Sequence, residues 1–139
     1  MIKRTFKLIN KLFQRKIFRF ATIGLIGFVV DYLTLQFFYL IIGFPIMFSR
    51  TLSFLFAVLS NWLLNRKWTF SSHQETNLKK QYSKFLMASA VAAIPNLVIF
   101  KILIMWLPQG QLSILLALVA GILVGFVVNF LLSLKWVFV

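Results

Sequence analysis

Three charged residues stand inside long apolar stretches of the sequence, and they are the first candidates for chemistry. Asp31 lies about eleven residues, or roughly 16 Å along a helix, into the stretch 20–42. Arg50 and Lys101 interrupt two other apolar stretches. Such charges are costly in hydrocarbon, so they usually face a bundle interior or a watery path and mark a substrate route. The alternatives are a structural hydrogen bond from a neutral Asp31 and outward snorkelling of the two cations.

The basic residues suggest two places where a phosphate group could bind. Arg50 and Lys101 predict one cationic site, and Arg66, Lys67 and Lys135 predict another near the opposite ends of the apolar stretches. Arg binds phosphate oxygens as a planar fork, whereas Lys acts as a point charge. A protein that moves a phosphorylated headgroup between leaflets needs cations at both sides of the membrane and a polar route between them.

The residues needed for catalysis or metal binding are missing from the sequence. His73 is the only histidine, Glu75 is the nearest acid to it, and there is no cysteine. Neither a phosphate-binding glycine loop nor a G-x-S-x-G nucleophile elbow occurs. We therefore expect no enzymatic activity, no metal and no cofactor.

The elements that must position these residues are membrane-spanning helices. Of the 139 residues, 61% are hydrophobic and 12% charged, which is far from the balance of a soluble domain. A helix needs about 20 mostly apolar residues to cross a bilayer. Four stretches meet that length, with turns expected at Gly43 to Pro45 and Pro108 to Gly110. They are 20–42, 45–65, 85–107 and 111–134.

The distribution of charge predicts the orientation of these helices. The chain has fifteen Lys and Arg against two acidic residues, and the basic residues cluster in 1–19 and around the loop 71–83. Clustering beside apolar stretches suits anionic lipid headgroups and argues against nucleic-acid binding. By the positive-inside rule, both termini and the loop 71–83 are cytoplasmic.

The segment 1–19 has its own pattern. Apolar residues recur at intervals of three and four, and basic residues follow a neighbouring line. This pattern predicts an amphipathic helix on the cytoplasmic membrane surface, with a disordered basic tail as the alternative.

The two halves of the chain resemble each other. Residues 61–70 and 129–138 are identical at six of ten positions. The first and third stretches correspond more weakly. Their matched residues are Phe20, Gly24, Gly27 and Asp31 with Phe85, Ser89, Ala92 and Asn96. The sequence therefore predicts a transmembrane domain at 20–139 built from two helical hairpins, 20–70 and 84–139, as parallel repeats about an axis along the membrane normal.

The repeat also selects one face on the second and fourth helices, because residues four apart are neighbours on a helix. Small residues allow close helix approach in lipid, and amides can hydrogen-bond across it. A plain packing surface is the alternative interpretation, although a functional role is favoured for Asn61 and Asn129. The two faces are Ser53, Ala57, Asn61 and Asn65, and Gly121, Gly125, Asn129 and Ser133.

With these residues in place, the chain from about Phe20 to its end resembles the GtrA-like family of small membrane proteins. The resemblance rests on ordered pieces: Phe20, Gly24, Gly27 and Asp31; then Asn61, Asn65, Arg66, Lys67, Trp68, Thr69 and Phe70; then Asn96; then Asn129, Lys135, Trp136, Val137 and Phe138. The resemblance implies that the chain is a protein of the bacterial cytoplasmic membrane that works together with a polyprenyl-phosphate glycosyltransferase. The implied activity is flipping of a polyprenyl-phosphate-linked monosaccharide for glycosylation of a surface polysaccharide or teichoic acid.

The predicted substrate-binding residues combine the charged positions with the amides. They are Asp31, Arg50, Asn61, Asn65, Arg66, Lys67, Asn96, Lys101, Asn129 and Lys135. The expected partners are membrane lipids, the lipid-linked sugar, the glycosyltransferase and a second copy of the chain. Two other functions stay open at this point: a scaffold that holds the glycosyltransferase at the membrane without transport, and a small multidrug exporter that uses Asp31.

The first prediction concerns topology. In intact cells, labels at both termini and at Gln74 should be protected from impermeant reagents, and labels at Gly43 and Gln109 should react. This follows from the basic residues flanking each stretch. Outside labelling at Gln74 would contradict the four-span arrangement.

Overall fold

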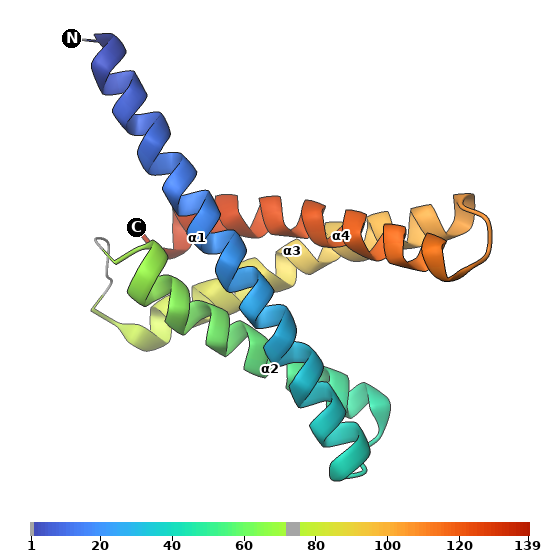
Figure 1. Cartoon of the computed structure of the whole chain (residues 1–139). Helices are drawn as coiled ribbons and strands as arrows, with labels where there is room; N and C mark the ends of the chain where they lie inside the picture. The colour runs from blue at the N-terminus through green and yellow to red at the C-terminus, as the bar shows by residue number, and fades with distance from the viewer. Residues whose placement is uncertain (1, 72–75) are drawn as a thin grey trace. The chain divides into compact units, whose positions relative to one another are not determined.

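The computed structural model describes residues 2–71 and 76–139, and every regular element in these two ranges is a helix. The all-helical fold class is confirmed for this part of the chain. His73, Gln74 and Glu75 lie outside the described residues. The chain divides into two compact units, Met1–Thr76 and Asn77–Val139. Each unit is a pair of packed helices, α1 on α2 and α3 on α4 (Figure 1).

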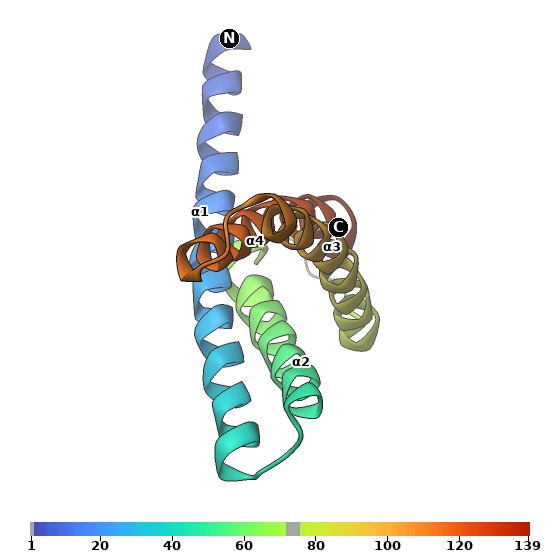
Figure 2. The same ribbon diagram turned by 90° about the vertical axis from the view of Figure 1, so that its right-hand side faces the viewer.

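Unit 1 begins with the long helix α1, Ile2–Gln36, which continues into a π-helical turn, η1, at Phe37–Ile41. The chain then reverses through Gly43, whose φ of +80° favours glycine, and returns as α2, Ile46–Leu64. A second π-helical turn, η2, follows at Asn65–Thr69. Figure 2 shows α1 and α2 side by side and running in opposite directions.

The predicted boundary between the amphipathic segment 1–19 and the first span falls inside α1. The structure has no helix end there, because no glycine or proline precedes Gly24 to interrupt the helix. The amphipathic segment and the apolar segment therefore form one continuous helix. Its placement on the membrane surface stays a prediction.

Unit 2 consists of α3, Leu78–Trp106, and α4, Gln111–Leu132, followed by the π-helical turn η3 at Ser133–Val137. The prediction of a loop through residue 83 is wrong in its second half, since α3 begins at Leu78. The reason is a local cap: the side-chain oxygen of Asn77 accepts a hydrogen bond of 3.1 Å from the backbone N–H of Lys80.

Three helical segments within the described residues are long and apolar enough to cross a membrane. They are Thr5–Ile41, Leu78–Trp106 and Val119–Val137. Large apolar side chains on these helices are exposed, among them Leu33, Leu97 and Leu123. Together with the composition, this makes the chain a multi-pass membrane protein whose outer surface faces lipid.

The two units contain matching contacts at the ends of their helices. In unit 1, the Phe20 and Phe70 rings meet edge-on at 6.3 Å, and in unit 2 Phe85 and Phe138 do so at 5.9 Å. All four rings are buried. The backbone N–H of Phe70 donates to the Asn65 carbonyl at 2.9 Å, and Phe138 donates to Ser133 at 3.0 Å. These aromatic pairs fix how each helix pair is aligned.

Gly43 and Gly24 give a matched test of the turn. Gly43→Ala should destabilise the chain by about 1 kcal/mol, because a residue with a Cβ atom is strained at positive φ. Gly24→Ala is the control, since it lies in α1 with no atom within 4 Å of an added Cβ. Thermal unfolding in detergent should show a lower Tm for Gly43→Ala alone. An equal loss in both variants would contradict this account of the turn.

Candidate functional site

The amide of Asn61 on α2 lies directly against Gly27 on α1. A Cβ atom at Gly27 would overlap this amide, with the Asn61 Cγ atom only 2.6 Å away. The Oδ1 atom of Asn61 is buried, and no hydrogen-bond partner reaches it among the described residues. A buried amide oxygen in this position is free to accept a hydrogen bond from a ligand or water.

Asp31 lies on the same face of α1 as Gly27, one helical turn further along. Because Gly27 lies against Asn61 and α2 runs antiparallel to α1, the residue one turn further along α1, Asp31, comes level with Ala57, one turn before Asn61. The side chain of Asp31 is half-buried, and its Oδ1 atom is buried. The structure therefore brings the predicted residues Asp31 and Asn61 to neighbouring turns of one helix contact.

Unit 2 has a corresponding polar contact built from Asn96. A Cβ atom at Gly121 would lie 2.6 Å from both the backbone oxygen and the Oδ1 atom of Asn96. A Cβ atom at Gly125 would lie 3.1 Å from the Asn96 Cβ and 3.1 Å from the Ala92 carbonyl oxygen. The absence of side chains at these two glycines lets α4 approach the polar face of α3.

Asn129 extends this polar contact along α4. Its Nδ2 atom donates to Ser89 Oγ at 3.5 Å, and its Oδ1 accepts from Ser133 Oγ at 3.5 Å. Ser133 is fully buried. We call the two sets together the polar helix contacts: Gly27, Asp31, Ala57 and Asn61 in unit 1, and Ser89, Asn96, Gly121, Gly125 and Asn129 in unit 2.

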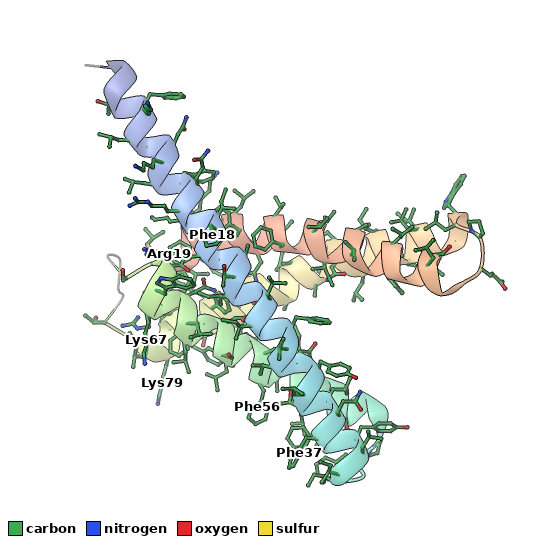
Figure 3. The ribbon with its side chains drawn as sticks, viewed as in Figure 1. Phe18, Arg19, Phe37, Phe56, Lys67 and Lys79 are labelled. Atoms are coloured by element: carbon green, nitrogen blue, oxygen red, sulfur yellow. The ribbon has the colours of Figure 1, made fainter. Side chains whose placement is uncertain are left out.

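Asn65 has a structural role that accounts for its burial. It is 1% exposed, and its Oδ1 accepts a hydrogen bond of 2.8 Å from Thr69 Oγ1 inside η2. π-helical turns of this kind often occur at functional sites. Here the turn carries Arg66, which is half-buried, and Lys67, which is exposed (Figure 3).

The remaining predicted cations are spread over both units. Lys101 on α3 and Lys135 on η3 are exposed. Arg50 lies in α2 by its backbone, and its side chain is outside the described part of the structure. Because Arg50 and Lys101 belong to different units, their pairing as one phosphate site stays a prediction.

A groove of about 430 Å³ in unit 1 is lined by residues outside the predicted substrate-binding set. Arg19 donates from Nη1 to the Trp68 carbonyl oxygen at 2.9 Å, and its guanidinium lies 5.5 Å from the centre of the Trp68 ring. The sequence did carry a signal, because Lys11, Arg15 and Arg19 recur at intervals of four and so share one helix face. The groove is lined by Lys11, Gln14, Arg15, Phe18, Arg19 and Trp68.

Comparison with known protein families identifies the chain. The family model described as GtrA/DPMS, transmembrane domain, matches residues 19–138. The chain belongs to the GtrA/DPMS transmembrane-domain family. No curated protein matches it. Membership confirms the resemblance drawn from the sequence and indicates involvement in the handling of polyprenyl-phosphate sugars. Both sets of polar helix contacts lie inside the matched range.

The two close helix approaches differ in what an added methyl group would meet. Gly27→Ala should destabilise the protein by about 1–3 kcal/mol through overpacking, and Asn61→Ala in the same chain should relieve most of that loss. Gly121→Ala is the matched comparison, because its Cβ would meet a backbone oxygen of Asn96 as well as the side chain. Asn96→Ala should therefore leave Gly121→Ala destabilised.

Thermal unfolding of the four single variants and two double variants in detergent provides the measurement. If the Asn→Ala substitution restores the stability of both glycine variants, the contact with the Asn96 backbone oxygen at Gly121 would be contradicted. Relief of neither would contradict the contact between Gly27 and the Asn61 amide.

Proposed function

We propose that this protein translocates a polyprenyl-phosphate-linked monosaccharide across the bacterial cytoplasmic membrane, for glycosylation of a surface polysaccharide or teichoic acid. The observation that carries the proposal is the family match over residues 19–138, because it covers α2, α3, α4 and the apolar part of α1. A glycosyltransferase on the cytoplasmic side supplies the lipid-linked sugar, and another enzyme uses it outside. The chain itself catalyses no covalent step.

The proposed topology has four spans, because α2 is taken to cross the membrane in addition to the three helical segments that are long and apolar enough. Both termini lie in the cytoplasm. Helix α2 packs against α1 (Figure 2), so an apolar α1 in the bilayer requires α2 to lie in it as well. The matching aromatic pairs, Phe20 with Phe70 and Phe85 with Phe138, support two hairpins as parallel repeats. Such repeats place substrate sites near the bilayer midplane in transporters.

The proposed roles follow from the chemistry of each group. Asp31, Asn61, Asn96 and Asn129 offer carboxylate and amide groups to the hydroxyls of a sugar as it passes the apolar core. Arg66, Lys67 and Lys135 contact the phosphate on the cytoplasmic side, and Arg50 and Lys101 receive it outside. Asn65 keeps η2 in shape and so positions Arg66 and Lys67.

A scaffold without transport is the second candidate function. The exposed basic residues of α1 favour it, because they could hold an acidic partner enzyme at the membrane surface. The scaffold does not explain polar side chains inside the bilayer, which are costly there and mark substrate pathways in most membrane proteins. The two functions therefore predict different effects of Asp31→Asn.

The decisive experiment measures leaflet-resolved transport of a polyprenyl-phosphate-linked sugar in proteoliposomes that contain only this protein. Translocation should depend on the protein, and Asp31→Asn should slow it by at least about tenfold, which corresponds to a barrier about 1.4 kcal/mol higher. Lys79→Gln is the control, since it removes an exposed charge at the start of α3. Protein content and helicity should be equal in all samples.

Two results would overturn this proposal. Absence of protein-dependent flipping for every lipid-linked sugar tested would exclude translocation. Full glycosylation in cells carrying Asp31→Asn, combined with its loss after charge reversal within residues 3–16, would favour the scaffold.

A further inference from the structure

The groove described above combines positive charge with aromatic surface. Its wall on α1 is formed by one helix face, and its other side is Trp68 on η2 of the same unit. Figure 3 labels Phe18 and Arg19 on this part of α1, next to the C-terminal end of α2. The groove has a volume of about 430 Å³ and is open to its surroundings along one side.

The cations of the groove are available to bind an anion. Lys11 and Arg15 are exposed, and within residues 2–71 and 76–139 no hydrogen bond or ion pair engages either side chain. Arg19 is held in place by the Trp68 carbonyl oxygen, which uses one of its five N–H donors. The chain has two acidic residues, and the one in the described part, Asp31, lies three helical turns beyond Arg19. The positive charge of the groove is therefore not neutralised by the described residues of its own chain.

The aromatic side chains of the groove continue toward the apolar part of α1. Phe18 is 70% exposed and Trp68 is 41% exposed, so each presents a face that is not packed against the rest of the unit. After Arg19, α1 carries no further basic residue. The groove thus lies where the basic part of the helix meets the apolar part, which is the level of lipid headgroups in a bilayer.

We propose that this groove binds the phosphate of a single-chain isoprenoid lipid, with the phosphate at Lys11, Arg15 and Arg19 and the first isoprene units against Phe18 and Trp68. The choice of an isoprenoid tail rests on the proposed function. The phosphate contact rests on the residues of the groove alone. It adds a docking site at which the lipid is held before or after translocation. Lys11, Gln14 and Arg15 precede the family-matched range, whereas Arg19 and Trp68 lie within it. The site therefore joins a segment that precedes the family-matched range with the family domain.

The test measures binding to the full chain in neutral detergent by native mass spectrometry, with geranylgeranyl monophosphate as the probe. Lys11→Gln and Arg15→Gln should each weaken binding about tenfold, the size expected for one charge-assisted hydrogen bond. Lys7→Gln and Lys79→Gln remove the same charge from α1 outside the groove and from α3, and each should change binding by less than about twofold. Because Lys11 and Arg15 are exposed, their variants should fold normally.

Four comparison ligands determine what the groove recognises. Geranylgeraniol, inorganic phosphate and phosphatidylglycerol should each bind more weakly than the monophosphate, and a decaglutamate peptide should not displace it. Equal binding of geranylgeraniol would overturn the phosphate contact, and equal binding of inorganic phosphate would overturn the lipid assignment. Equal binding of phosphatidylglycerol would indicate a general anionic-lipid surface, and displacement by the peptide would indicate a protein-docking surface. An equal loss in all four variants would also overturn the proposal.

This experiment is independent of transport. Normal binding by the groove in a protein that does not flip lipid-linked sugars would overturn the proposed function and leave the groove assignment intact. If the protein transports lipid-linked sugars normally but its Arg15→Gln variant binds the monophosphate as tightly as the unchanged protein, the groove assignment would be overturned and the proposed function would stand.

Discussion

The structure depends on one constraint: polar side chains inside membrane helices need space between backbones, and glycine provides that space. Asn61 lies directly against Gly27 in unit 1, and Asn96 lies against Gly121 and Gly125 in unit 2. In lipid, helices gain little from burying apolar side chains, so close packing and polar contacts must hold each pair together. The same contacts leave amide atoms inside the helix pair, including the Asn61 Oδ1 atom. Packing and the proposed route for a polar headgroup therefore use the same residues.

The helix ends support these polar contacts by fixing the alignment of each pair. A shift of α2 along α1 by one residue would move Asn61 away from Gly27, since neighbouring residues on a helix point in different directions. The edge-on rings of Phe20 and Phe70 oppose such a shift in unit 1, and Phe85 with Phe138 do so in unit 2. The π-helical turns η2 and η3 begin immediately before these aromatic contacts and bury Asn65 and Ser133. Alignment and burial at the ends thus determine which polar atoms face each other in the middle.

Much of this architecture could be predicted from the sequence, because apolar length and turn residues act locally. Gly43 and Gly110 mark both helix reversals, and the four apolar stretches match the cores of α1 to α4. The start of α3 was missed because a single side-chain cap at Asn77 extends the helix by a turn and a half into a polar segment. The contact between Asn61 and Gly27 could not be predicted, since it depends on the alignment of two helices rather than on either one. The groove at Arg19 could not be predicted for a different reason: basic residues next to a span usually contact lipid, and only the structure places Trp68 beside them.

The proposed function requires that the polar helix contacts of each unit are open to water and to a polar headgroup. The chain contains no cysteine, so single cysteines can be introduced without altering other positions. Cysteine at Asn61 or Asn129 should react with a small water-soluble thiosulfonate, and a polyprenyl-phosphate-linked sugar should slow that reaction. Cysteine at Leu59 or Leu131, whose apolar side chains are exposed on the surface of their units, should stay unreactive, and cysteine at Gln109 should react as a positive control. No reaction at Asn61 and Asn129, with normal reaction at Gln109, would show that the polar helix contacts are dry packing surfaces and would contradict the account.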